Sequence, residues 1–217
     1  MATLFILSLQ PVWAENATFK VDPEAGNNTF STVFDAALGE RIMAVTSGID
    51  CTVTVDEGKL DDTAKCLVPL KAIKVDNDDT KTEHFQLWAT NKKSEPEKCT
   101  FDLDVPGVKL PSALAEKKPV SFTADGTFTI CGRKRDDGGA EHLSGTVISL
   151  PSAPGEPRVL RIRARVEHFD RERYGISPKH TAGWLARVQQ LATVVATDGT
   201  IDVNIFATDT ADEQAKK

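Results

Sequence analysis

The sequence lacks the short motifs that carry most familiar enzyme chemistry. It contains no G-x-S-x-G nucleophile elbow, no phosphate-binding P-loop, no dinucleotide fingerprint and no H-E-x-x-H zinc motif. Its 4 histidines have no i,i+4 partner, and its cysteines form no C-x-x-C pair, so zinc-ribbon and redox sites lack the spacing they need. We therefore expect no catalytic residue, no metal ion and no other cofactor.

An excess of basic residues is also missing, and so is a long hydrophobic run. The 26 Lys and Arg residues face 32 Asp and Glu residues, a formal charge of −6 that argues against nucleic acid as a partner. The apolar opening MATLFILSLQPVWA, residues 1–14, is shorter than the ~20 residues of a membrane span. It ends Val12-Trp13-Ala14, which fits a cleavage site after a small residue, although no Lys or Arg precedes the apolar run. We predict a signal-peptide remnant; the alternative is a buried first strand, which Pro11 weakens.

Four cysteines are present, and they fit an oxidising compartment, either the periplasm or the exterior of the cell. Cys51 and Cys66 lie at similar distances on either side of the turn signal at 57–58, so a hairpin would place them opposite one another on the same face. Cys99 and Cys131 have opposite parity relative to their apolar neighbours. Either a bulge allows this second pair to form a disulfide, or both thiols remain free.

Alternation of apolar and polar residues is common along the chain, whereas helical periodicity is scarce. The clearest example is 158–167, where Leu160, Ile162, Ala164 and Val166 share one parity and charged side chains occupy the other, as in a half-buried strand. The same criteria predict strands at 17–22, 28–36, 41–46, 50–56, 63–73, 97–105, 120–130, 142–150 and 200–206. Many short strands separated by turns predict an all-β fold, either an antiparallel sandwich or a barrel.

Two segments break this alternation. Residues 80–90, TKTEHFQLWAT, predict a short helix that presents Phe85, Leu87 and Trp88, and residues 179–196 predict an amphipathic helix. The first helix is expected to form a lid or mouth over the barrel, or else to plug one barrel end.

No linker, internal repeat or low-complexity tract divides the chain. The simplest division is a signal-peptide remnant at 1–14, one β-barrel domain at 15–210, and a polar tail at 211–217 that we expect to fray.

Four features, in this order along the chain, resemble the YceI-like family of periplasmic lipid-binding proteins. The first is FKVDP at 19–23 followed by a strand at 31–34, and the second is 73–101, with its acidic loop and E-H-F turn. The third is GTFTICG at 126–132, similar to the family's "G-x-LT-x-x-G" strand. The fourth is DRERYGI at 170–176, similar to its "D-R-x-x-F-G-I" element. The resemblance covers most of the predicted mature chain.

The resemblance implies an antiparallel lipocalin-like β-barrel of about eight strands with one or two short helices, a size that just encloses one small or elongated ligand. It also implies non-catalytic binding, storage or transport of a long-chain apolar lipid, a polyisoprenoid or an isoprenoid quinone. Transient membrane contact and a homodimer are further expectations for such a carrier.

Parity and the resemblance together select the side chains expected to contact the lipid. They are Phe19, Phe30, Phe34, Phe85, Leu87, Trp88, Phe101, Leu103, Phe122, Phe128, Ile130, Leu160, Ile162 and Val166. The alternative is that they fill an ordinary closed core, because parity identifies an inside without showing that it is hollow. A packed interior would fit a stress-related interaction protein instead.

Two polar features have competing interpretations. Six arginines are crowded into one stretch, Arg158, Arg161, Arg163, Arg165, Arg171 and Arg173. They either capture an anionic head group or form a solvated strand face that blunts a sheet edge, with Arg171 and Arg173 the better candidates for capture. Separately, His84 with a carboxylate such as Asp78 could serve a barrel hydrolase or isomerase, provided that the two lie within hydrogen-bond reach.

Overall fold

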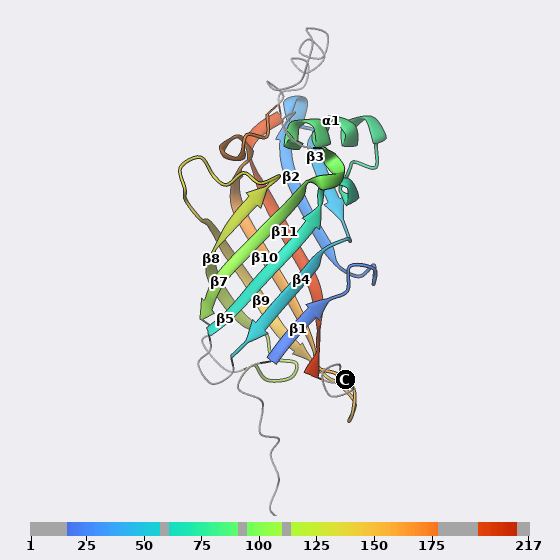
Figure 1. Ribbon diagram of the computed structural model, residues 1–217, viewed down its shortest axis with the longest axis vertical. Coiled ribbons are helices and arrows are strands. Elements are labelled where there is room, and N and C mark those ends of the chain that lie inside the picture. Colours follow the sequence, from blue (N-terminus) through green and yellow to red (C-terminus); the bar gives the residue numbers. More distant parts are fainter. Residues whose placement is uncertain (1–16, 57–60, 91–94, 110–113, 178–194, 212–217) are drawn as a thin grey trace, which may run out of the picture.

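The predicted strands form, although those expected at 63–73 and 97–105 run instead from 61 to 69 and from 100 to 109. Their hydrogen bonds join the strands into one antiparallel sheet that closes on itself (Figure 1). The computed structural model describes residues 17–56, 61–90, 95–109, 114–177 and 195–211. The predicted signal remnant, most of the predicted helix at 179–196 and nearly all of the tail lie outside these ranges.

Eight strands make the closed ring, which confirms the predicted all-β barrel. In spatial order they are β1 (Ala17–Val21), β4 (Asp50–Val55), β5 (Asp61–Pro69), β7 (Thr100–Lys109), β8 (Val120–Ile130), β9 (Glu141–Leu150), β10 (Val159–Asp170) and β11 (Val195–Asp209), and β11 pairs with β1 to close the ring. A branch of three strands continues from β11: β2 (Thr29–Ala36), β3 (Arg41–Thr46) and β6 (Lys74–Val75).

Helical structure is sparse in the described residues. The α-helix α1 (Asp79–Thr90) follows β6 and lies across one end of the barrel beside β2 and β3 (Figure 1). Single 3₁₀ turns lie between the longer elements: η1 (Ala37–Gly39), η2 (Leu70–Ala72), η3 (Pro96–Lys98) and η4 (Arg171–Tyr174). The helix predicted at 80–90 is therefore confirmed. Among the described helices, none is long and apolar enough to cross a membrane.

The alternation in β10 orients its side chains as predicted. Leu160 and Val166 are buried inside the barrel, while the arginines between them point outward. One expectation is corrected, because β10 pairs with β9 on one side and with β11 on the other and is not a sheet edge. The outward arginines instead bond across to β11: Arg165 binds Asp202 at 2.6 Å, and Arg161 binds Asn204 at 3.1 Å.

Barrel closure depends on the length of β11, which is long enough to pair with three strands, β10, β1 and β2. Its residues 207–209 pair with β1, whereas 195–204 pair with β2. Between these ladders lies the buried amide of Asn28, which donates to the Asp22 carbonyl and accepts from the Phe206 backbone N–H, both at 2.9 Å. The Asn28 side chain therefore takes the place of a backbone partner where β1 ends and β2 begins.

Both cysteine pairs form disulfides. Cys51 and Cys66 are register partners on β4 and β5, as the spacing predicted. Cys99 and Cys131 also pair, which resolves their parity conflict: Cys131 follows the last residue of β8 and has a positive φ of 48°, so its side chain no longer follows the strand's alternation.

We predict that Asn28→Ala lowers the free energy of unfolding by about 1–3 kcal/mol, because it leaves a buried backbone N–H without a partner. Chemical denaturation of the purified protein measures this value. Asn27→Ala is the matched control, since Asn27 is exposed and adjacent, and it should change stability by no more than about 0.5 kcal/mol. Equal losses in the two variants would contradict the role of the Asn28 amide.

Candidate ligand-binding site

A cavity of about 300 Å³ lies beneath α1 at the branched end of the barrel. We call it the upper cavity. Its walls are mainly aromatic and aliphatic: β2 contributes Phe30 and Phe34, α1 contributes Phe85 and Trp88, and β7 contributes Phe101. Such a volume and lining are typical of a site for a small apolar ligand.

The upper cavity has a polar mouth. Glu40, Thr80 and Lys81 are exposed to solvent and also line the cavity, so it opens between the start of β3 and the first turns of α1. The Lys81 ammonium binds the Asp76 carboxylate at 2.8 Å. That hydrogen bond raises the pKa of Lys81 above its usual value, so Lys81 is a cation at neutral pH.

A second, smaller cavity of about 80 Å³ lies further along the barrel axis, and we call it the lower cavity. Its lining is almost wholly apolar and comes from the closed ring, with Val53, Leu103, Ala124, Leu143, Ile162 and Ile205 among the contributors. Several of these inward side chains are only half-buried, Leu103 and Ile162 among them, because they face empty space inside the barrel. The interior is therefore hollow at two levels.

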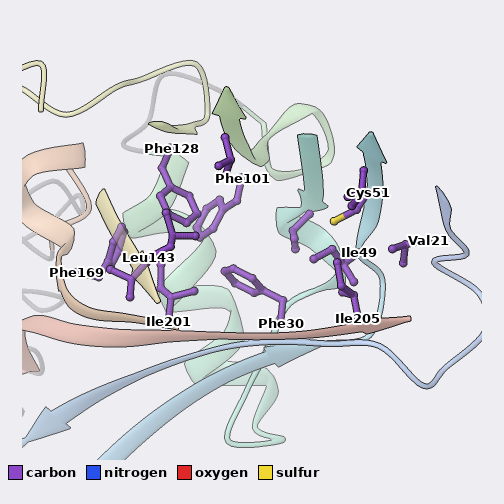
Figure 2. Close-up of a cluster of buried hydrophobic side chains, with 14 of the residues drawn as sticks. Val21, Phe30, Ile49, Cys51, Phe101, Phe128, Leu143, Phe169, Ile201 and Ile205 are labelled. Carbon is purple, nitrogen blue, oxygen red and sulfur yellow. The ribbon is translucent and has the colours of Figure 1, made fainter. Parts of the chain in front are cut away.

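Phenylalanine side chains separate the two cavities. Along β7, Phe101 lines the upper cavity and Leu103 lines the lower one; along β11, Ile201 and Val203 divide in the same way. Phe30 meets Phe101 edge-on with ring centroids 6.2 Å apart. Figure 2 shows Phe30 pointing toward Phe101 and Phe128 in the middle of the barrel. We call Phe30, Phe101 and Phe128 the aromatic partition.

The residues predicted to contact a ligand divide into four groups. Those on the upper cavity are Phe30, Phe34, Phe85, Trp88 and Phe101. Those on the lower cavity are Leu103, Phe122, Leu160 and Ile162. Those in the core, on neither cavity, are Phe19, Phe128, Ile130 and Val166. The last is Leu87, which lines neither cavity and is 43% exposed, because one residue along a helix rotates the side chain by about 100° away from Trp88.

Sequence analysis missed Thr32, which also lines the upper cavity and is only 3% exposed. Thr32 shares inward parity with Phe30 and Phe34 on β2. A polar residue at an inward-facing position of a strand was the sequence signal that could have identified Thr32.

Arg171 is buried beside the upper cavity, where its guanidinium is held by backbone oxygens. It donates to the carbonyls of Ala196, Ile176 and Val195 at 3.0, 2.6 and 2.9 Å. Burial lowers the pKa of Arg171 below its usual value. These bonds fasten η4 to the start of β11. The DRERYGI element at 170–176 therefore stabilises this end of the barrel.

A buried polar network supports η4 from the other side. The Tyr174 hydroxyl donates to Glu141 Oε1 at 2.8 Å, and Arg135 binds the same oxygen at 3.0 Å. Burial, together with the Glu141 hydrogen bond, raises the pKa of Tyr174 well above its usual range, so the phenol stays protonated and donates. Its ring stacks on Phe169, which lines the upper cavity. Arg173 lies at the surface and binds Asp137 at 2.8 Å.

Both ends of α1 are anchored to the barrel. At its first turn, Thr82 accepts from the Val75 backbone N–H and donates to the Asp78 carbonyl, at 2.9 and 2.7 Å. At its last turn, Arg133 donates to the Ala89 and Thr90 carbonyls. The same guanidinium donates to the Tyr174 carbonyl at 2.8 Å, which joins the helix to η4.

His84 and Asp78 are the pair expected in the alternative hydrolase or isomerase. His84 is half-buried and lines the upper cavity, so its side chain is not fully exposed to bulk solvent. Asp78 accepts a hydrogen bond from the Lys81 backbone N–H, and within the described residues no hydrogen bond joins Asp78 to His84. The described part of the chain also holds no cluster of three or more His, Cys, Asp or Glu residues suited to a metal ion.

A closed antiparallel ring with a helix over one end and an apolar cavity beneath it defines a lipocalin-like barrel. No family model matches the sequence, and no curated protein matches it either. The chain is similar to the solved structure of a polyisoprenoid binding domain from Saccharophagus degradans, one implicated in plant cell wall breakdown. The TM-score is 0.60 at 11% sequence identity, and the match covers 90% of this chain and 98% of that domain. The predicted resemblance is thus confirmed at the level of the fold.

We predict that Arg133→Met releases the last turn of α1, because it removes the donors to Ala89 and Thr90 while keeping an apolar stem. Amide hydrogen exchange in residues 79–90 should speed up, most strongly in the second half of the helix. Lys134→Met is the control, since Lys134 is exposed and adjacent. If the amide protection of α1 is unchanged in Arg133→Met, the Arg133 hydrogen bonds are not needed to hold the end of the helix.

Proposed function

We propose that this protein binds the apolar chain of a lipid in the upper cavity, without catalysing a reaction on it. The observation that carries the proposal is the combination of a hollow, largely aromatic interior with a charged, solvent-exposed mouth. An amphipathic molecule fits this polarity, with its chain inside and any strongly hydrated group outside.

The size of the upper cavity bounds how much of a lipid it holds. A water-sized group occupies about 30 Å³ in a liquid, so about 300 Å³ has room for roughly ten such groups, or two isoprene units. Burying ten methylene-sized groups contributes about 8 kcal/mol before the costs of ordering. This gross gain corresponds to micromolar binding, so after the costs of ordering the expected affinity lies between micromolar and millimolar.

The known binding domain with the same fold supports an isoprenoid chain as the lipid. The two disulfides support a working place in an oxidising compartment, the periplasm or the exterior of the cell. A carrier or reservoir role follows from a ligand that is enclosed and released unchanged.

The first experiment extracts the purified protein with organic solvent and analyses the extract by mass spectrometry. We expect a stoichiometric apolar lipid, or an empty protein that binds short isoprenoids such as geraniol and farnesol with micromolar to millimolar affinity in a fluorescent-probe displacement assay. A protein that is empty and also rejects every such chain would overturn the proposal.

A second prediction concerns the aromatic partition as a limit on chain length. Phe101→Ala should join the upper and lower cavities and shift preference toward chains longer by about one isoprene unit. Phe19→Ala is the matched control, since Phe19 is equally buried but lines neither cavity; each substitution should cost about 3–5 kcal/mol of stability. The readout is the ratio of farnesol to geraniol affinity in the same assay. If both variants keep the parent's ratio, the partition does not set the length.

A further inference from the structure

The turn that follows β8 contains a strained residue. Cys131 and Gly132 have positive φ angles of 48° and 75°, and two backbone hydrogen bonds between Ile130 and Arg133, at 2.8 and 2.9 Å, close the turn around them. Two-residue turns with positive φ at both central positions favour Asn-Gly or Asp-Gly. Gly132 adopts this conformation freely, whereas a side chain such as that of Cys131 disfavours it. A contact elsewhere must therefore hold Cys131 in place.

The Cys99–Cys131 disulfide supplies that contact. Cys99 is itself firmly placed, because it is only 2% exposed and its carbonyl accepts from the Leu70 backbone N–H at 2.9 Å. The Cys131 backbone N–H donates to the Thr100 carbonyl, also at 2.9 Å. The disulfide thus ties the strained turn to the start of β7. Without the S–S bond, the strain at Cys131 favours a rearrangement of the turn.

The strained turn is joined to α1 through Arg133, two residues after Cys131. The Arg133 guanidinium donates to the Ala89 and Thr90 carbonyls in the last turn of the helix. Trp88, which precedes Ala89, forms part of the wall of the upper cavity. A rearrangement of the turn therefore displaces the donors that hold the end of α1, and it loosens the helix that borders the cavity.

The other disulfide joins two strands without such strain. Cys51 and Cys66 are register partners on β4 and β5, and neither has a positive φ. The ladder between these strands continues on both sides of the pair. Loss of this bridge lowers the stability of the fold but releases no backbone strain, so Cys51–Cys66 is a matched comparison for Cys99–Cys131.

We propose that the Cys99–Cys131 disulfide is a redox-sensitive anchor of α1. Its reduction by a dithiol loosens the last turn of the helix and speeds the exchange of lipid with the upper cavity. This inference rests on the proposed function, because it adds a means of regulating the same site.

Reduction follows the usual course of thiol–disulfide exchange. Cys131 is half-buried beside the exposed Gly132, whereas Cys99 is buried, so a thiolate of the dithiol attacks Cys131 Sγ. The S–S bond breaks, and Cys99 Sγ leaves as a thiolate that takes up a proton. The second thiol of the reductant then attacks the reductant's own sulfur in the mixed disulfide. Cys131 is released as a thiol, and the dithiol, having given up two electrons and two protons, becomes a cyclic disulfide.

The first test is amide hydrogen exchange in residues 79–90 of the purified full chain without ligand, before and after reduction with dithiothreitol. A left-handed backbone at a residue other than glycine carries a cost that corresponds to about fivefold to thirtyfold in an opening equilibrium. We expect exchange in the second half of α1 to speed up by this factor on reduction. A Cys99–Cys131 bond that dithiothreitol leaves intact in the folded protein would overturn the proposal.

The control is Cys51→Ala/Cys66→Ala, which keeps the Cys99–Cys131 bond. Its α1 should exchange as slowly as in the parent when oxidised, and it should respond to dithiothreitol as the parent does. If α1 already exchanges fast in this variant when oxidised, general loss of stability explains the effect and the proposal is wrong.

Two variants without the Cys99–Cys131 bond test the role of the strained turn. Cys99→Ala/Cys131→Ala should exchange like the reduced parent. Cys99→Ala/Cys131→Asn should stay within about twofold of the oxidised parent, because asparagine tolerates a positive φ. Equal exchange of α1 in the two variants would contradict the account of how the disulfide acts.

The second test is the rate at which bound phenylnaphthylamine, a fluorescent apolar probe, leaves the protein after mixing with excess farnesol. Reduction should raise this rate about fivefold or more in the parent and leave it unchanged in Cys99→Ala/Cys131→Asn. Faster amide exchange with an unchanged release rate would show that the anchor does not control the cavity, which overturns the proposal. If the parent binds neither the probe nor farnesol, the proposed function fails, and amide exchange still decides whether the disulfide anchors α1.

Discussion

Closure of the sheet through β11 is the interaction on which the remaining structure depends. One strand pairs with β10 along its length, with β1 at one end and with β2 at the other. Pairing with β1 completes the ring, and pairing with β2 carries a branch away from it. The branch ends at the two-residue β6, from which the chain enters α1. The position of the helix over the barrel end thus follows from how β11 divides its partners.

The same division explains why the interior has two levels. Where the ring is closed by strands on all sides, inward side chains approach one another and leave only about 80 Å³. Where α1 and the branch replace part of the ring, the walls stand further apart and enclose about 300 Å³. The Arg133 and Arg171 hydrogen bonds fix the two elements that border this space, α1 and η4. The hydrogen bonds of these two arginines at the barrel end therefore help to keep the apolar upper cavity open.

Local pattern was enough to predict the strands, the helix α1 and the Cys51–Cys66 pairing, because alternation and turn spacing act over a few residues. It was not enough for contacts that depend on closure. The hydrogen bond from Phe206 to Asn28 spans 178 positions, and no neighbouring residue signals it. The separation of Phe101 from Leu103 between two cavities likewise depends on side chains from across the barrel. Arg171 was predicted as a candidate for anion capture, but its surroundings after folding are backbone carbonyls.

The most direct test of the account is a crystal structure of the protein purified without solvent extraction or added lipid. The account predicts continuous electron density for an apolar chain in the upper cavity, in contact with Phe85 and Trp88 and ending at the aromatic partition. An upper cavity that contains only ordered water, or one that α1 has collapsed to fill, would contradict it.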